Sequence, residues 1–183
     1  MRILIIIITL LTSAKISVGQ DSAKFRLLTY GLPNFEREDA KKIIAYKWSI
    51  DFYSVAGCVV DQELEDSVAR ENKIQDERIT ASYGKGWSNK FEKEVDNEYH
   101  IHQQVTKLID KQNFIKNNNV ELEKIGQSLY YKIQRTDIEK VYYVIVDSWG
   151  KWGGTGEFII YYKLQVDYKR KIVKILSDKA MIE

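Results

Sequence analysis

The sequence predicts an α+β fold, in which N-terminal helices and one early strand pack on a C-terminal four-stranded antiparallel meander. Three observations indicate this class. Apolar residues recur at steps of three or four over much of residues 34–125, the spacing of one helix face. After Gly126 the period falls to two and β-branched and aromatic residues dominate, as in half-buried strands. The linkers between these last runs are too short for the crossovers that parallel strands need.

Asn34 begins the first predicted helix, because its side chain can cap a first turn that is rich in acidic residues. This helix ends near Ser49, and a β-rich run follows over residues 50–60. Gly57 interrupts that run, so we expect a buried strand with a bulge at the glycine. No other strand is expected before the meander.

Two more helices fill the segment between this strand and the meander. Asp61 caps the first of them, and Gly84 and Gly86 end it. The three asparagines at 117–119 break the helical register afterwards, which leaves residues 120–125 as a short turn of helix. Ser88 opens the helix in between, whose apolar face has the clearest periodicity of the chain: Phe91, Val95, Tyr99, His102, Val105 and Ile109.

The predicted meander has strands over residues 129–134, 141–146, 157–166 and 172–176. Alternate residues of a strand point to opposite faces, so one side of the longest strand should be core. In outline, helices on one face of such a sheet are similar to cystatin-like and NTF2-like folds, a likeness of architecture that implies no function. The expected core side consists of Phe158, Ile160, Tyr162, Leu164 and Val166.

The N-terminus has the form of a secretory signal peptide. Arg2 precedes an apolar run over residues 3–11, shorter than the roughly 20 apolar residues that a membrane-spanning helix needs. Small residues stand where cleavage before Gln20 requires them. We therefore expect a signal peptide over residues 1–19 and a single α+β domain over residues 20–183, periplasmic or secreted, with no stable membrane insertion. An uncleaved N-terminal anchor is the alternative.

The composition limits the classes of partner and indicates the kind of organism that the protein comes from. Without Arg2 and Lys15, the 28 basic residues fall to 26 and equal the 26 acidic ones. A nucleic-acid binder needs a basic face, so we expect no nucleic-acid partner. The bias to Ile, Lys, Asn and Tyr, with no Asn-x-Ser/Thr sequon, favours a bacterial protein. Cys58 is the only cysteine, so no intramolecular disulfide forms, and its apolar neighbours predict a buried, inert thiol.

Glu98, His100 and His102 have the side chains that zinc prefers. On a helix, Glu98 and His102 share a face, but His100 points about 160° away from His102. Two ligands do not complete a metal site, so we expect no metal and no cofactor. We expect His102 to be partly buried. The burial expected of Cys58 also disfavours a thiol nucleophile with His102 or His100 as its base.

Aromatic residues supply the candidate binding site. Trp149 and Trp152 stand in a connection that is too rich in glycine to pack as a strand, so we expect a loop. Their rings must be covered either by local packing against Phe158 or by a ligand. On the strands, one ring of each neighbouring tyrosine pair must point away from the core. The expected surface therefore consists of Trp149, Trp152, Tyr130, Tyr142 and Tyr161.

The leading hypothesis is an exported bacterial domain that binds a protein, peptide or carbohydrate without catalysis, because such rings offer large contact area at low entropic cost. A small periplasmic hydrolase with a pocket between helices and sheet is the alternative enzyme class, and it would need polar groups on inward strand positions. An envelope structural protein or an immunity-type inhibitor would use the same surface for a protein partner.

Overall fold

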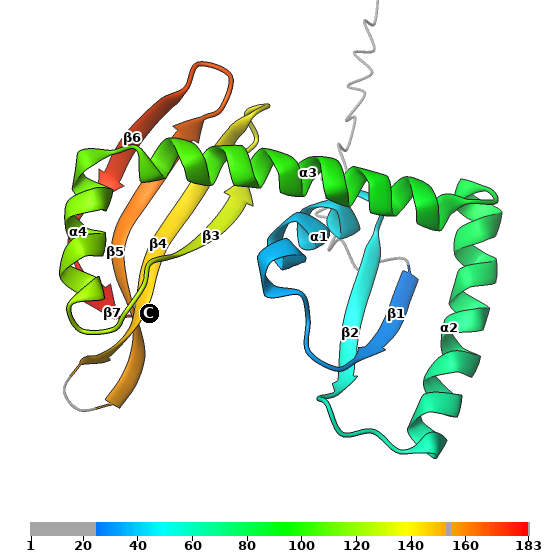
Figure 1. Ribbon diagram of the computed structural model, residues 1–183. Coiled ribbons are helices and arrows are strands. Elements are labelled where there is room, and N and C mark those ends of the chain that lie inside the picture. Colours follow the sequence, from blue (N-terminus) through cyan, green and yellow to red (C-terminus); the bar gives the residue numbers. More distant parts are fainter. Residues whose placement is uncertain (1–24, 153–154, 183) are drawn as a thin grey trace, which may run out of the picture.

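One long helix, α3 (Trp87–Asp110), organises the chain, because one side of it packs on two separate hydrophobic clusters (Figure 1). The computed structural model describes residues 25–152 and 155–182, so the predicted signal peptide lies outside the described residues. The predicted apolar face of α3 is confirmed. Phe91, Val95, Val105 and Ile109 are at most 1% exposed.

The first cluster is built on a two-stranded parallel sheet. β1 (Phe25–Tyr30) pairs with β2 (Ile50–Ala56), and α1 (Phe35–Lys47) is the crossover between them. The expected helix and strand are present here, but the strand is only partly buried and ends at Ala56, before the glycine at which a bulge was expected, and β1 was not expected. Because the early strand is one of a parallel pair, α2 (Gln62–Tyr83) packs on that pair rather than on the meander, and α1 contacts both.

The free edge of β1 is closed by a side chain of α2. Asn72 accepts a hydrogen bond from the backbone N–H of Leu28 and donates one to its C=O, both at 2.8 Å. The carboxamide thus supplies the donor and the acceptor that a further strand would supply. Asp61 caps α2 as expected, since its carboxylate accepts from Leu64 N at 2.9 Å.

The second cluster lies under the C-terminal half of α3 and under α4 (Asn113–Glu123), against an antiparallel sheet. The sheet runs in the order β3 (Tyr130–Arg135), β4 (Val141–Trp152), β5 (Thr155–Asp167) and β6 (Ile172–Ser177), and β7 (Met181–Ile182) also pairs with β5. The α+β class and the four-stranded antiparallel order are confirmed. The asparagine run at 117–119 does not break a helix, because it lies inside α4.

A β-bulge in β5 changes which residues face the core. Val146 pairs with Tyr162, but the next residue, Asp147, pairs with Ile160, so Tyr161 is the additional residue. Beyond the bulge the alternation is reversed, and Ile159 rather than Phe158 points to the helix side. The predicted core side of β5 is therefore correct at Tyr162, Leu164 and Val166 and wrong at Phe158, whereas Ile160 is buried at 6% exposure although it faces away from the second cluster.

The two halves of the molecule are also joined by a direct contact between α1 and β3. The Asp39 carboxylate accepts a hydrogen bond from Ile133 N at 2.9 Å. Among the helices in the described part of the chain, none is both long and apolar enough to cross a membrane.

Candidate functional site

Four side chains gather on the sheet face opposite the second cluster. Residues 133, 144 and 146 point into that cluster, so strand alternation turns Lys132 and Trp149 to the other face. The Trp149 and Phe158 rings meet edge to face at 5.0 Å, and Lys132 Nζ lies 4.8 Å from the Phe158 ring centre. Tyr130 is two residues before Lys132 and shares its face. We call Trp149, Phe158, Tyr130 and Lys132 the aromatic patch.

The aromatic patch is open to solvent. Trp149 is 52% exposed, Tyr130 53% and Phe158 37%. Lys132 Nζ also lies 3.1 Å from the Oδ2 atom of the buried Asp147, so this lysine adds little net charge. The patch thus offers apolar and amphipathic rings around a neutralised centre, which suits a partner that is itself partly apolar.

The two tryptophans lie in a strand, not in the expected loop. β4 continues through Trp152 and β5 begins at Thr155, and these two residues pair across the strands. Two of the glycines that suggested a loop, Gly150 and Gly156, are required for packing, and Gly153 and Gly154 lie outside the described residues. A Cβ atom at Gly150 would lie 2.8 Å from Ile159 Cδ1, and one at Gly156 would lie 2.6 Å from Trp149 Cζ2. The indole of Trp149 therefore rests on the bare backbone of Gly156.

Two of the other expected binding residues, Tyr142 and Tyr161, do not join this surface. Tyr142 is 1% exposed and points into the second cluster, so its expected place on the open face is wrong. Its neighbour Tyr143 is the ring that faces away from the cluster. Tyr161 is half-buried at the bulge, and burial raises its pKa. Trp152 belongs to β4 by its backbone, and its side chain lies outside the described residues.

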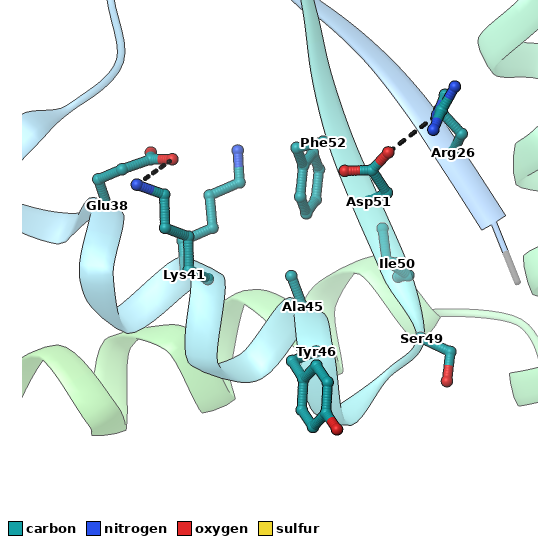
Figure 2. Close-up of a pocket in the computed structure, with 10 residues that line it drawn as sticks. Arg26, Glu38, Lys41, Ala45, Tyr46, Ser49, Ile50, Asp51 and Phe52 are labelled. Atoms are coloured by element: carbon teal, nitrogen blue, oxygen red, sulfur yellow. Dashed lines mark hydrogen bonds and ion pairs between the residues drawn. The ribbon is translucent and has the colours of Figure 1, made fainter. Parts of the chain in front are cut away.

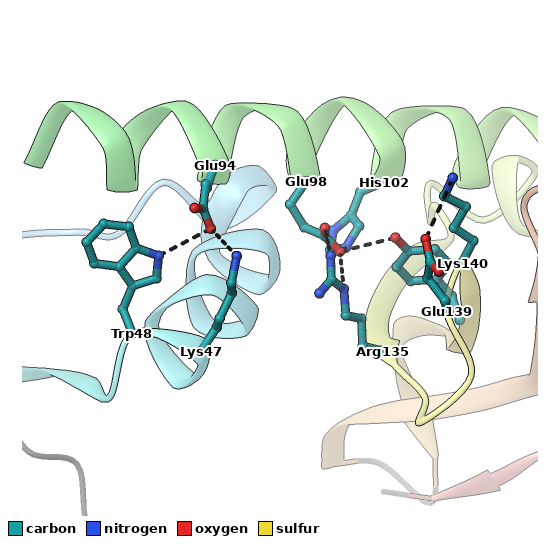
Figure 3. Close-up of polar contacts among 9 residues, drawn as sticks. Lys47, Trp48, Glu94, Glu98, His102, Arg135, Glu139 and Lys140 are labelled. Carbon is teal, nitrogen blue, oxygen red and sulfur yellow. Dashed lines mark hydrogen bonds and ion pairs between the residues drawn. The ribbon is translucent and has the colours of Figure 1, made fainter. Parts of the chain in front are cut away.

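A buried polar group lies beneath α3, between the two hydrophobic clusters (Figure 3). The Glu98 carboxylate, 2% exposed, accepts hydrogen bonds from Arg135 Nε at 3.2 Å and from an Arg135 terminal nitrogen at 2.5 Å. The Tyr142 hydroxyl donates to Glu98 Oε1 at 3.2 Å, and His102 Nε2 lies 3.5 Å from the same oxygen. The expected shared face of Glu98 and His102 is thus confirmed, and His102 is buried.

Charge compensation dominates in this group. Burial alone would raise the pKa of Glu98, but His102 and Arg135 together lower it below its ordinary value. Burial, followed by the negative charge of Glu98, raises the pKa of Tyr142 to about 12. Both carboxylate oxygens are occupied by donors from the protein itself. The arrangement is that of a buried ion pair which ties α3 to the sheet, rather than of a poised acid or base.

The remaining candidate ligands are dispersed. Throughout the residues that the structure describes, no group of three or more His, Cys, Asp or Glu side chains could hold a metal ion. Cys58 is exposed, so the prediction of a buried thiol is wrong. The reason is that β2 ends at Ala56, and Cys58 lies in the turn before α2 with Val59, which is 92% exposed.

A hollow of about 520 Å³ lies between α1 and β2 (Figure 2). Its charged groups already contact one another. Arg26 Nε lies 2.8 Å from Asp51 Oδ2, and Lys42 Nζ lies 4.0 Å from Glu38 Oε1. Lys41 Nζ lies 3.8 Å from the centre of the Phe52 ring. This hollow therefore presents little unpaired charge to a ligand, and the aromatic patch is the stronger candidate.

Comparisons with protein-family models, with curated proteins and with solved structures found no match to this chain.

Proposed function

We propose that the protein is an exported bacterial binding domain without catalytic activity, and that the aromatic patch contacts a protein partner. The observation that carries the proposal is the position of Trp149. This large ring lies on the part of β4 that extends beyond the end of β3, it packs on Gly156 and Phe158, and half of it is still exposed. Export follows from the pattern of residues 1–19, and it predicts that the mature protein begins near Gln20.

Shape and composition favour a protein partner over a small molecule. Neither of the two hollows described in this structure is lined by a residue of the aromatic patch. Exposed surfaces with such rings bind other proteins through a few aromatic anchors, which lose little side-chain entropy on binding and dominate the affinity. The exposed rings of Trp149, Tyr130 and Phe158 have this composition. An immunity-type inhibitor or an envelope structural protein would both use such a surface.

Capture experiments with matched variants test the proposal. The purified protein is immobilised and exposed to the extracytoplasmic proteins of the source bacterium and, separately, to a panel of oligosaccharides. Trp149→Ala should weaken retention of the specific partner about tenfold or more, the effect of losing an interface anchor. Phe35→Ala removes a ring that is 73% exposed on α1 and serves as the control, which should retain the partner unchanged.

Gly156→Ala provides a second test that leaves the tryptophan in place. The new Cβ would lie within 2.6 Å of the indole, so the ring must move away from its position on the backbone. Partner binding should fall in this variant as well. Retention that is equal in the parent, Trp149→Ala and Gly156→Ala would contradict the proposed contact surface. Retention of sugars alone, lost in Trp149→Ala, would keep the surface and replace the protein partner by a carbohydrate.

A further inference from the structure

A second hollow, of about 680 Å³, lies between the C-terminal end of α3 and the turn that joins β5 to β6. Four lysines line it from two directions. Lys107 and Lys111 come from the end of α3, and Lys169 and Lys171 come from the turn. The hollow shares no residue with the aromatic patch, so its function is independent of the one proposed above.

The four lysines have no carboxylate partner among the described residues, whereas their neighbours do. Arg170 lies 3.7 Å from Asp167, and Lys140 lies 3.8 Å from Glu139. The one acidic residue of the hollow, Asp110, is engaged elsewhere, because its carboxylate accepts a 2.5 Å hydrogen bond from the Tyr131 hydroxyl. Four positive charges therefore face a single negative charge. Such a site concentrates anions.

The walls of the hollow are fixed by the fold. Leu108 and Tyr168 line it and also pack against the second cluster. The Tyr168 N–H donates to the Lys140 carbonyl at 3.0 Å, and the Arg170 N–H donates to Asp167 Oδ1 at 2.9 Å. These bonds hold the turn in one conformation. The backbone that carries Lys169 and Lys171 is thereby set opposite α3 before any ligand binds.

Stabilisation of the C-terminal end of α3 explains the positions of only two of the four lysines. Lys107 and Lys111 lie in the last turn of α3 and at its C-cap, where cations interact favourably with the helix dipole. Lys169 and Lys171 belong to a β-turn and have no such role. A ligand that carries more than one negative charge on closely spaced oxygens accounts for all four. A phosphate group has this chemistry, and it binds compact ammonium groups well.

We propose that this hollow binds a phosphate group, carried either by a lipid headgroup at a membrane surface or by a soluble phosphate ester. Leu108 and Tyr168 would contact the apolar part of the same ligand, next to the lysines. Binding is peripheral and electrostatic in either case, so it weakens as salt is raised.

Two probes distinguish the sources. Vesicles of phosphatidylcholine containing phosphatidylglycerol represent the lipid, with pure phosphatidylcholine vesicles as the control. Inorganic pyrophosphate represents the soluble ester, with citrate as a carboxylate of comparable charge. Co-sedimentation measures the first interaction, and calorimetric titration measures the second. Binding to the anionic vesicles alone assigns a headgroup, and binding to pyrophosphate alone assigns a soluble ester.

Charge-matched double variants decide whether the hollow is the site. Lys169→Gln with Lys171→Gln should weaken binding to the active probe by about fivefold for each lysine, the effect expected of one surface cation near an anionic membrane. Lys85→Gln with Lys93→Gln removes the same charge from exposed positions of the N-terminal half and should leave binding unchanged. Lys107→Gln with Lys111→Gln should repeat the first result from the helix side.

Three results would overturn the proposal. The first is no binding of the parent protein to either probe at low salt. The second is an equal loss in the hollow variants and in the control variant, because that would reflect net charge alone. The third is citrate binding as tight as pyrophosphate binding, which would show that the site has no preference for phosphate.

Discussion

Replacing Trp149 by alanine should destabilise the fold much less than replacing Trp48. Trp48 is 8% exposed, its ring lies 4.8 Å from that of Tyr83, and its Nε1 donates to Glu94 at 3.2 Å (Figure 3). Almost all of its surface is removed from water, and its removal leaves a cavity between α1 and α3. For such a site we expect Trp48→Ala to cost about 3–5 kcal/mol in the free energy of unfolding.

Trp149 differs from Trp48 both in how much of its surface is buried and in whether its removal leaves a cavity. About half of its surface is covered, chiefly by Gly156 and Phe158. The free energy gained by removing the ring from water is therefore about half as large as for Trp48. Solvent fills the space left by an exposed ring, and no cavity forms. We therefore expect Trp149→Ala to cost about 1–2 kcal/mol.

Urea unfolding followed by far-ultraviolet circular dichroism measures both variants, since backbone signals are insensitive to the loss of one indole. The comparison is meaningful if the slopes of the two unfolding transitions agree, because the same surface is then exposed on unfolding. Equal losses of stability in Trp48→Ala and Trp149→Ala would refute the reasoning. The ring on the sheet would then be part of the core, and the proposed binding surface would lose its main support.

Three further outcomes follow from the buried polar group and from the turn after β2. Cys58 should react with a thiol reagent in the native protein nearly as fast as in urea, and strong native protection would show that the turn is covered. Glu98→Gln should lower the free energy of unfolding by about 2–3 kcal/mol, since it breaks a buried pair whose Arg135 partner is half exposed, and an unchanged urea midpoint would contradict the assigned ion pair. Tyr142 ionises near pH 10 when unfolded and near pH 12 when folded, so the unfolded state alone loses the proton between these values. Its contribution to stability is complete below pH 10 and is lost as pH rises towards 12, and Tyr142→Phe should flatten that part of the stability profile.

Local sequence patterns were sufficient to predict a segment when one face of it contacts apolar neighbours along its whole length. The face of α3 was predictable because Phe91, Val95 and Val105 recur with helical spacing and all meet apolar neighbours. β1 was not predictable in the same way. It is only six residues long, and its pairing with β2 depends on a crossover through α1.

The candidate site was only partly predictable, because glycine has two uses. In β4 and β5, glycine leaves space for the side chains of Ile159 and Trp149. A glycine with this packing role cannot be told from a turn glycine by sequence alone. The bulge at Tyr161 has no local signal either, and it exchanges the two faces of β5 beyond that point. The partners of Glu98 were hidden for another reason. Arg135 and Tyr142 follow it by 37 and 44 residues, and only the packing of β3 and β4 under α3 brings them together.

The spacing of residues along α3 has a consequence for how the two halves find their alignment. The side that packs inward reads Phe91, Val95, Glu98, His102, Val105 and Ile109, which is a strict alternation of four and three steps. A shift of the helix by one seven-residue repeat would place Glu98 and His102 where Phe91 and Val95, or Val105 and Ile109, now meet one of the two hydrophobic clusters. Such a slip would set Phe91 or Val105 opposite Arg135 and leave its guanidinium without a carboxylate. Glu98 and His102 therefore favour one alignment, because a shift by a full repeat would bury both side chains in a hydrophobic cluster and would separate Glu98 from Arg135.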